Sequence, residues 1–314
     1  MLATINESPA WHRKEVVLAF AMASHPRLGA ESPLNVLDGD LLREVLTLLP
    51  IVVGGPDGTA FTLKEAMEMA LGDGQVISVS KGEHIVGSNP GQLDDTSGLT
   101  SLQITRPVRL TGDPAGGTVL RGMLELVDGA TSGSISHLTI HDAGQRACVR
   151  ASVGCWTLDR CILLSGHAAA VRAEGEAQVV ARRCRFGGEG EIGTAVALEY
   201  ELPRQWVDTA GSVQEYGLRK HSCYGLFAQD SASILIDSCQ VSYCSESAVF
   251  LRDKGSAVLR RSALMRCRIA FTAGEGMGGA LHVDDLCRLE EVPQVWYDTD
   301  RPGRCAVPFV ECEA

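Results

Sequence analysis

Apolar positions recur along the middle of the chain at an almost constant spacing. One series, with the pattern apolar-x-x-(Cys/Leu/Tyr/Ser)-x-apolar, begins at Ile135, Leu158, Ala181, Val213, Ile236 and Leu259. A second series of short apolar segments interleaves with it, and its first apolar residues are Val149, Val171, Val196, Leu226, Val249 and Phe271. Two interleaved series with one common period predict a repeat protein built from short strands.

The period of the first series is about 23 residues, which together with two or three short strands and small turn residues is typical of one coil of a parallel β-helix. Leucine-rich repeats have a similar length, but their Leu-x-x-Leu-x-Leu pattern and fixed Asn are absent here. We therefore predict a mainly β fold, a single-stranded right-handed parallel β-helix with an N-terminal α-helical cap. The coil from Ala181 to Val213 is longer than the others, by about nine residues. We assign the excess to an excursion at "EYELPRQWVDTAG", which contains Trp206 and leaves the solenoid.

Residues 1–50 have a helical pattern instead. In "LNVLDGDLLREVLTLLP" the apolar face of one helix comprises Leu41, Leu42, Val45, Leu46 and Leu49. Pro50 ends this helix because proline cannot continue the backbone hydrogen bonding. A helix at this place can cover the open end of the solenoid, or it can present its apolar face to a partner protein.

The same helix resembles the start of an F-box, whose pattern is Leu-Pro-x-Glu-Leu-Leu-x-x-Ile-Leu-x-x-Leu. The matching residues are Leu37, Asp40, Leu41, Leu42, Val45, Leu46 and Leu49. Asp38 stands where that family usually has proline, and "IVVGGPDG" follows directly in place of the rest of the motif. The resemblance implies an adaptor of the ubiquitin pathway that recruits another protein through this helix.

Residues 51–125 contain a short helix followed by buried strands. Thr62 and Glu65 form a capping box for a helix that runs to Ala70, and "VISV" predicts a buried strand. This order, with the Gly-rich turn and "GDGQVISVSKGEH", resembles the first coils of right-handed parallel β-helices of the pectin lyase-like group. We expect the β-helix to span residues 51–290, after the helical region 1–50 and before an irregular C-terminal cap at 291–314.

Composition and charge argue against some classes of binding partner. The net charge of −11 and the pI of about 5.2 argue against electrostatic binding to nucleic acid or to an anionic membrane. The apolar run Val16–Ala23 is much shorter than the roughly 20 residues of a membrane span, and its lead-in is a poor signal peptide. Eleven cysteines without a disulfide framework favour reduced thiols. We expect a cytoplasmic or nuclear protein.

The segment "LDRCILLSGH" offers a candidate thiol site, because Cys155, Cys161 and His167 follow one another at equal intervals. In the repeat, however, Cys161 aligns with Leu138, so we predict that it is an inward-facing small hydrophobe. The column at this position reads Leu138, Cys161, Cys184, Tyr216, Cys239 and Ser262. The spacing also lacks a Cys-x-x-Cys pair and a fourth ligand for zinc. We predict neither a catalytic Cys161–His167 pair nor a metal site.

The pectin lyase-like resemblance implies a carbohydrate-active enzyme as one class of function. Its motifs occur only as fragments, without the order or coil placement of that group: Asp94-Asp95, Asp284-Asp285, "SGH" at 165–167, "AQD" at 228–230 and "RIA" at 268–270. Glycoside hydrolysis needs two carboxylates that face each other across a sugar. We therefore predict no catalytic residue and no cofactor, and keep a polysaccharide lyase or glycoside hydrolase as the alternative.

The outward positions of the second strand are the candidate binding face. One column comprises Arg150, Arg172, Ala197, Phe227, Phe250 and Thr272, and the next comprises Ser152, Glu174, Glu199, Gln229, Arg252 and Gly274. The two arginines lie beside Glu174 and Glu199, an arrangement that either grips a charged ligand or forms cross-coil ion pairs. Phe227 and Phe250 are either covered by the excursion with Trp206 or exposed as an apolar patch.

These patterns favour a non-catalytic recognition scaffold that binds a protein partner or a glycan. The partner-binding residues that we predict are Leu41, Leu42, Val45, Leu46, Leu49, Trp206, Phe227 and Phe250. The candidate ligand face comprises Arg150, Arg172, Glu174 and Glu199. An F-box-like substrate adaptor is the more specific form of this prediction.

Overall fold

The computed structural model describes residues 49–55, 58, 62–86, 101–142, 147–165, 168–188, 224–273, 280–284, 286–292 and 294–298. The predicted helical residues Leu41, Leu42, Val45 and Leu46 lie outside these ranges, as do Val196, Glu199 and Trp206. Leu49 lies inside them, is half-buried, and accepts a hydrogen bond at its carbonyl from Gln75 Nε2 at 3.0 Å.

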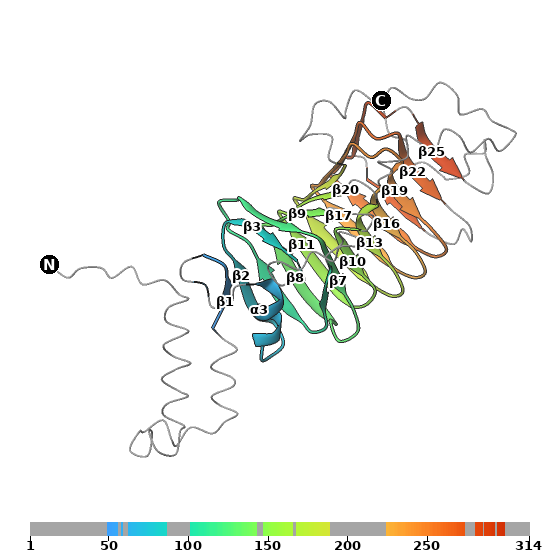
Figure 1. The fold of residues 1–314 in the computed structure, drawn as a ribbon. Helices are drawn as coiled ribbons and strands as arrows, with labels where there is room; N and C mark the ends of the chain where they lie inside the picture. Colours follow the sequence, from blue (N-terminus) through green and yellow to red (C-terminus); the bar gives the residue numbers. More distant parts are fainter. Residues whose placement is uncertain are drawn as a thin grey trace, which may run out of the picture.

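The strands stack into three all-parallel sheets that wind around one core, so the fold is the predicted right-handed parallel β-helix (Figure 1). Sheet A, with nine strands, contains β1 (Ile51–Val53), β2 (Gln75–Val79), β5 (Val108–Thr111), β8 (Ser132–Ser136), β11 (Cys155–Asp159), β14 (Gln178–Arg182), β17 (Ser233–Asp237), β20 (Ser256–Arg260) and β23 (Leu281–Val283). Sheet B, with eight, contains β3 (Gly82–Ile85), β6 (Thr118–Arg121), β9 (Thr139–Asp142), β12 (Ile162–Ser165), β15 (Arg185–Gly187), β18 (Gln240–Ser242), β21 (Ala263–Met265) and β24 (Arg288–Glu290). Sheet C, also with eight, contains β4 (Ser101–Ile104), β7 (Met123–Leu126), β10 (Val149–Ala151), β13 (Ala169–Ala173), β16 (Tyr224–Ala228), β19 (Ser247–Leu251), β22 (Ile269–Ala273) and β25 (Gln294–Asp298).

A short helix, α3 (Leu63–Met69), lies beside β1 and β2 at the first coil. Its capping box is formed as predicted: Glu65 N donates to Thr62 Oγ1 at 3.1 Å, and Thr62 N donates to Glu65 Oε2 at 3.2 Å. Leu63 and Ala66 belong to the core and are buried. The helix therefore covers part of the apolar interior that the first coil would otherwise leave open.

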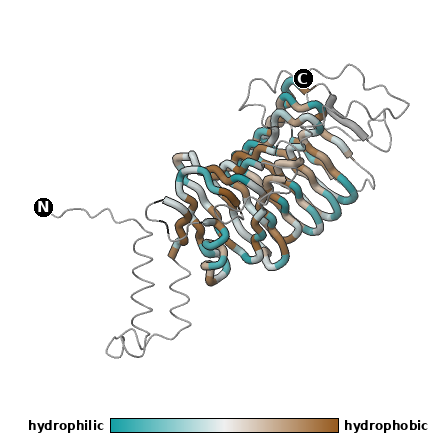
Figure 2. Tube along the Cα trace, in the orientation of Figure 1, coloured by the Kyte–Doolittle hydropathy of each residue, from teal (hydrophilic) through white to brown (hydrophobic). Residues whose placement is uncertain are grey.

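The core is a set of inward columns, one residue per coil. In sheet A, Ile135, Leu158 and Ala181 pair in register. Hydrophobic stretches recur from coil to coil along the tube in Figure 2. Trp156 is fully buried, and its Nε1 donates to Ala130 O at 3.0 Å. The residue opposite it is Gly133, where a Cβ would lie 2.4 Å from the indole ring. Glycine at this position leaves the space that the large ring fills.

One member of each predicted series is wrong. Ala181 in β14 pairs directly with Ile236 in β17, so Val213 is not the next member of the first series. Val171 in β13 pairs directly with Leu226 in β16, so Val196 is not the next member of the second. Short apolar segments between these strands matched the repeat by chance, because the pattern at each rung is only six positions long.

The coil that contains the long connection is therefore longer than the sequence suggested. Cys184 and Cys239 take equivalent places in adjacent coils and are 55 residues apart in the sequence. Cys161 and Cys184, one coil earlier, are only 23 residues apart. The extra length at this joint exceeds one whole coil, whereas the sequence indicated an insertion shorter than half a coil.

A sharp turn joins sheet A to sheet B in each coil and explains the cysteine column. The residue after the sheet A strand has a positive φ in five coils, at His137, Arg160, Arg183, Ser238 and Arg261. The next residue belongs to the core in each of these coils. In three of them its sulfur or hydroxyl accepts a backbone N–H from the preceding coil. Cys161 N donates to Cys184 Sγ at 3.4 Å, Cys184 N to Cys239 Sγ at 3.4 Å, and Cys239 N to Ser262 Oγ at 3.1 Å. Tyr216, which the sequence placed between Cys184 and Cys239, is therefore not a member of this column.

The solenoid continues beyond residue 290, where the sequence placed its end. Strand β25 pairs in parallel with β22 over residues 294–298, and residues 299–314 lie outside the described ranges. No helix in the described part of the chain is long and apolar enough to cross a membrane.

Candidate recognition face

The outer face of sheet C carries a column of polar and aromatic side chains that changes character along the solenoid. In-register pairing places one residue from each of the seven strands β4 to β22 in it: Gln103, Glu125, Arg150, Arg172, Phe227, Phe250 and Thr272. We call this set the sheet C column. Its first four members are polar or charged, the next two are aromatic, and Thr272 is buried.

The charged part of the column is a chain of cross-coil ion pairs. Arg150 Nη2 donates to Glu174 Oε2 at 2.7 Å, and Arg172 Nε pairs with the other oxygen of the same carboxylate. Glu125 Oε1 lies 4.0 Å from Arg150 Nη1, and its other oxygen accepts a hydrogen bond from Gln103. The arginine side chains are 42–44% exposed, whereas those of the two glutamates are only 9–12% exposed.

The ion pairs match one of the two interpretations of these residues, cross-coil pairing. Two guanidinium groups are balanced by two carboxylates in this part of the face. Its geometry is that of cross-coil pairing, and Glu174 restricts both arginines. One result is that Arg172 is held beside the next member of the column, with its guanidinium carbon 5.0 Å from the centre of the Phe227 ring.

The aromatic part is a cluster of three half-buried rings. Phe227 and Phe250 stack with centroids 4.9 Å apart and an interplanar angle of 16°. Tyr224, from the start of β16, contacts both rings at centroid distances of 6.0 and 5.2 Å. The two phenylalanines are outward and stacked, as predicted, and the rigid strands on which they lie fix their spacing.

Two predicted members of this site do not belong to the described face. Glu199 and Trp206 lie outside the described residues, and the sheet pairing puts Phe227 rather than Ala197 next to Arg172. In the neighbouring column Gln229 follows Glu174, because Gln229 N donates to Ala173 O and Glu174 N to Ala151 O.

Sequence reasoning missed Glu125 and Tyr224. Glu125 precedes Arg150 by slightly more than the common period, so a search at a fixed period does not align it with the column. The alternation in "MLEL" was the available signal, since it predicts one outward polar residue in a short buried strand. Tyr224 is three positions before Phe227 and thus belongs to a neighbouring column, and only the side-chain geometry brings the rings together.

The cysteine column is part of the core, as the alignment of Cys161 with Leu138 predicts. Cys161 and Cys184 are each 1% exposed, and the described cysteines are free thiols. The hydrogen bond between these two thiols raises the pKa of Cys184 to about 12 and lowers the pKa of Cys161. His167, the other half of the candidate thiol pair, lies outside the described residues. In the described ranges no three His, Cys, Asp or Glu side chains are grouped so that they could hold a metal ion.

Comparison with known proteins adds a structural likeness. No protein family model matches the chain, and no curated protein matches it in sequence. Among solved structures it is similar to a pectin methylesterase from Aspergillus niger, with a TM-score of 0.43 and 11% identity over 79% of this chain and 85% of that chain.

Proposed function

We propose that this β-helix is a non-catalytic recognition scaffold whose sheet C column binds a partner protein. The single observation behind the proposal is the stack of Phe227 and Phe250, half-exposed on rigid strands and flanked by Arg172. Aromatic and arginine side chains are enriched among the residues that dominate protein–protein binding energy. Because neighbouring strands hold the rings, few of their rotamers remain to be fixed when a partner binds.

The orientation of the rings favours a protein over a sugar. A sugar platform offers the open face of an aromatic ring, but Phe227 has Phe250 against one face and the Arg172 guanidinium over the ring. The rings therefore present mainly their edges, which suit apolar side chains of a partner.

The test compares the wild-type chain with a Phe227→Ser, Phe250→Ser double variant. The wild type is used as bait, and the partners that it captures are purified and titrated against both proteins by calorimetry. We expect the double variant to lose about 2–4 kcal/mol of binding free energy, that is, about 30-fold or more in Kd. An Arg109→Gln, Arg160→Gln double variant is the control, since both arginines are exposed and lie outside sheet C. Equal binding by all three proteins would remove the proposal.

The carbohydrate-active alternative is tested separately. The observation that favours it is the approach of two carboxylates, Glu125 and Glu174, to the single guanidinium of Arg150 on an outer sheet face. Wild-type protein is assayed on acidic polysaccharides with and without calcium, beside Glu125→Gln and Glu174→Gln variants. Turnover that either variant abolishes, while its thermal unfolding stays close to wild type, would replace the scaffold proposal with an enzymatic one.

The F-box-like helix gives the more specific form of the proposal, in which the scaffold is a substrate adaptor. Its support is the sequence pattern alone. A pull-down with the usual adaptor partner of F-box proteins is compared between the wild type and a Leu42→Asp, Leu46→Asp double variant. We expect binding only by the wild type. Absent or equal binding would rule out a role as a ubiquitin-pathway adaptor. It would not affect the proposal about the sheet C column.

A further inference from the structure

The outer face of sheet A has an apolar centre on three adjacent coils. Its middle column, in register from β5 to β23, comprises Arg109, Ser134, Thr157, Val180, Leu235, Val258 and His282. Val180, Leu235 and Val258 are half-buried, whereas the residue before each of them belongs to the core and is 1% exposed. The column is therefore apolar at its centre and polar at both ends, as a protein interface with a core and a rim is.

A second outward column of the same face alternates in charge. It lies two positions further along each strand and comprises Asp159, Arg182, Asp237 and Arg260 in register. We call this set the alternating column. Arg182 and Arg260 are exposed, and neither is in an ion pair with another residue that the structure describes.

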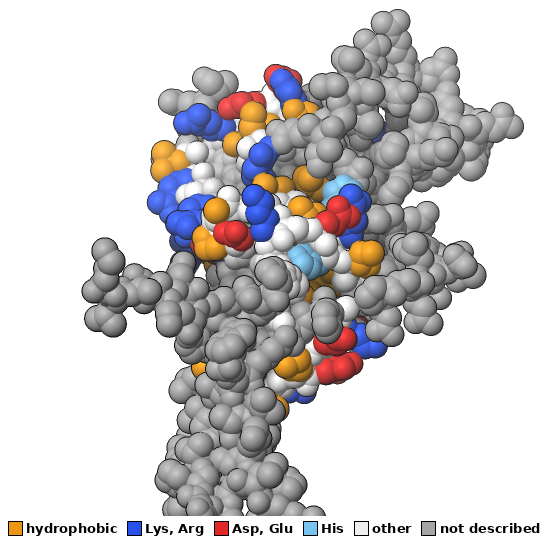
Figure 3. All heavy atoms as spheres, turned by 60° about the vertical axis from the view of Figure 1, so that its left-hand side comes forward, with side chains coloured by type: hydrophobic (Ala, Val, Ile, Leu, Met, Phe, Trp, Pro, Cys, Tyr) orange, Lys and Arg blue, Asp and Glu red, His pale blue; other side chains and the backbone are white. Residues whose placement is uncertain are grey.

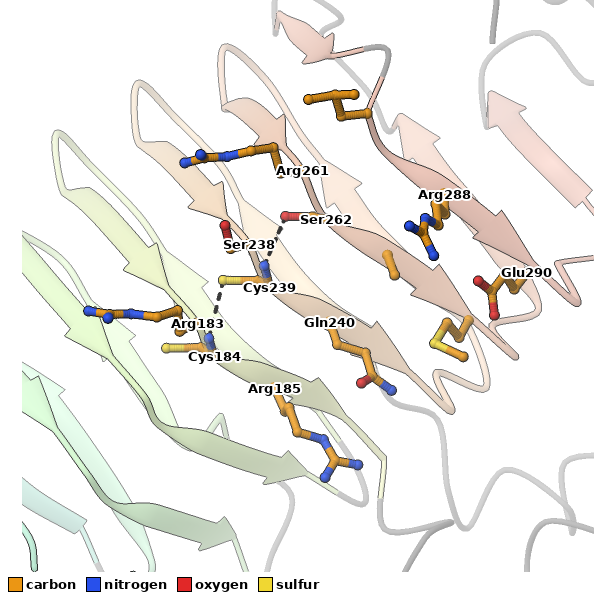
Figure 4. A pocket seen from close by; sticks show the side chains of 13 residues that line it. Arg183, Cys184, Arg185, Ser238, Cys239, Gln240, Arg261, Ser262, Arg288 and Glu290 are labelled. Atoms are coloured by element: carbon orange, nitrogen blue, oxygen red, sulfur yellow. Dashed lines mark hydrogen bonds between the residues drawn. The ribbon is translucent and has the colours of Figure 1, made fainter. Parts of the chain in front are cut away.

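The two aspartates are fixed by arginines of the adjoining turns. Arg183 Nε and Nη2 both donate to Asp159 Oδ1, at 3.1 and 2.7 Å, and Arg261 pairs with Asp237 in the next coil but one. Arg183 and Arg261 extend in the same direction in Figure 4. The hydrogen bond from Arg261 lowers the pKa of Asp237, so this carboxylate stays ionised. A carboxylate offers about four acceptor positions, so each aspartate can accept a further donor from outside the chain.

The local arrangement of charge on this face differs from the net charge of −11. Lys and Arg side chains also lie close to Asp and Glu side chains at several places on the face in Figure 3. The alternating column itself carries two charges of each sign. A ligand with charge of one sign is therefore both attracted and repelled along it, and a surface with the opposite alternation fits it best.

The alternating column is its own complement when its order is reversed. A two-fold axis parallel to the strands, midway between β14 and β17, sets each column of sheet A against the same column of a second copy in reverse order. Arg182 then lies opposite Asp237 of the second copy, and Arg260 lies opposite Asp159 of the second copy. An axis through β17 itself would set Arg182 opposite Arg260, so the charges select an axis between two strands.

We propose that the outer face of sheet A binds the same face of a second copy of this chain, with the coils in opposite order. The same axis sets Val180 against Leu235 of the second copy, and Val258 against its Thr157. The strands from β8 to β23 then face each other over about 29 Å by 16 Å, or about 450–500 Å² per copy. Interfaces below about 1,200 Å² in total belong to weak complexes, so we expect a Kd between about 1 µM and 1 mM. The proposal concerns another face and does not depend on the sheet C column.

Sedimentation equilibrium of the wild-type chain across this concentration range tests the association. We expect a reversible equilibrium between monomer and dimer. A Leu235→Asp variant places a charge at the centre of the apolar column and should weaken the dimer about tenfold or more. A wild type that stays monomeric up to about 1 mM, or that forms species larger than a dimer, would overturn the proposal. So would a Leu235→Asp variant that dimerises like the wild type.

Two charge variants assign the contact to the alternating column. An Arg182→Glu, Arg260→Glu variant makes the column wholly acidic, and an Asp159→Lys, Asp237→Lys variant makes it wholly basic. Each alone should dimerise about tenfold more weakly than the wild type or worse, because like charges then face each other. A 1:1 mixture should form a heterodimer, which unfolded variants cannot do.

The matched control is an Arg252→Glu, Arg288→Glu variant, which changes the net charge as the acidic variant does but at exposed positions outside sheet A. It should dimerise within about twofold of the wild type. Equal losses in the control and the acidic variant would overturn the proposal, and so would a mixture of two folded charge variants that does not associate. Thermal unfolding shows which variants are folded. If the basic variant is not, the comparison of the acidic variant with the control decides.

Discussion

The two faces of sheet C obey different rules although they alternate along the same strands. The inward column is apolar throughout: Leu102, Leu124, Val149, Val171, Leu226, Val249 and Phe271. The outward column passes from Glu125 through two arginines to two phenylalanines. An inward position meets the same kind of neighbour in each coil, so its chemistry is fixed by stacking. An outward position faces solvent, so its chemistry can change from one coil to the next, as it does from Arg172 to Phe227.

The largest effect is expected when one side chain on each face of β16 is shortened to alanine. Leu226→Ala should lower the free energy of unfolding by about 2–5 kcal/mol, because a fully buried side chain leaves a cavity. Phe227→Ala, at the next position, should cost less because its ring is half-exposed. Urea denaturation of both variants measures the difference. A larger loss for Phe227→Ala would mean that the stacked rings belong to the core.

A second prediction concerns the cysteine column, where an inward position accepts a backbone hydrogen bond. Cys184→Ala removes the acceptor of Cys161 N and should cost about 1–3 kcal/mol of stability. Cys184→Ser should recover part of the loss, since Ser262 already accepts Cys239 N in the same way. The denaturation midpoints of the two variants measure this recovery. Equal midpoints would show that the sulfur acts only through its volume.

Removing the shared carboxylate should have a smaller effect on stability. Glu174→Gln ends the ion pairing of Arg150 and Arg172 with this side chain, and we expect a loss of about 1 kcal/mol because both arginines are more than a third exposed. The difference from wild type should shrink at high salt, which screens exposed charges. Denaturation at low and at high ionic strength checks this. A loss independent of salt would indicate a packing role for Glu174 instead.

The smallest predicted effect is a dependence of the protein's stability on pH. Burial raises the pKa of Cys287 from 9.0 to about 11. The folded state therefore keeps this thiol protonated where the unfolded state has lost the proton, so its contribution is complete below pH 9 and is lost as the pH rises toward 11. Because the thiol is only half-buried, we expect it to contribute at most about 1 kcal/mol to the free energy of unfolding. Cys287→Ser should flatten the fall in stability over this range, and an unchanged pH profile would contradict the assignment.

The sequence predicted the class of fold because every coil requires an apolar residue at the same inward positions. Leu158, Cys161 and Leu163 are inward as the repeat required, and the Thr62–Glu65 capping box is present. The register failed at the long connection, since a short apolar pattern also occurs outside the solenoid. The candidate face was predicted only in part. Phe227 is outward as predicted, but the places of Glu125 and Tyr224 depend on coil length and on side-chain direction.

The sheet B column that contains Arg185 and Arg288 could not be predicted, because its register depends on the length of the connections between coils. Arg185 and Arg288 are far apart along the chain, and they share a column only through two intervening strands. The positive φ of Arg183 and Arg261 was also unexpected, since nothing in an arginine favours that conformation. The turn imposes it, and the hydrogen bonds to the next inward residue hold it.

The direct pairing of β14 with β17 has a consequence for protein engineering. A connection longer than a whole coil at this joint leaves the flanking strands in the same register as every other coil. Because each doubling of a flexible loop costs only about 0.6 kcal/mol, length at such a joint is thermodynamically cheap. The boundary between residues 188 and 224 is thus a natural site for grafting a foreign peptide or a small domain onto a rigid rod.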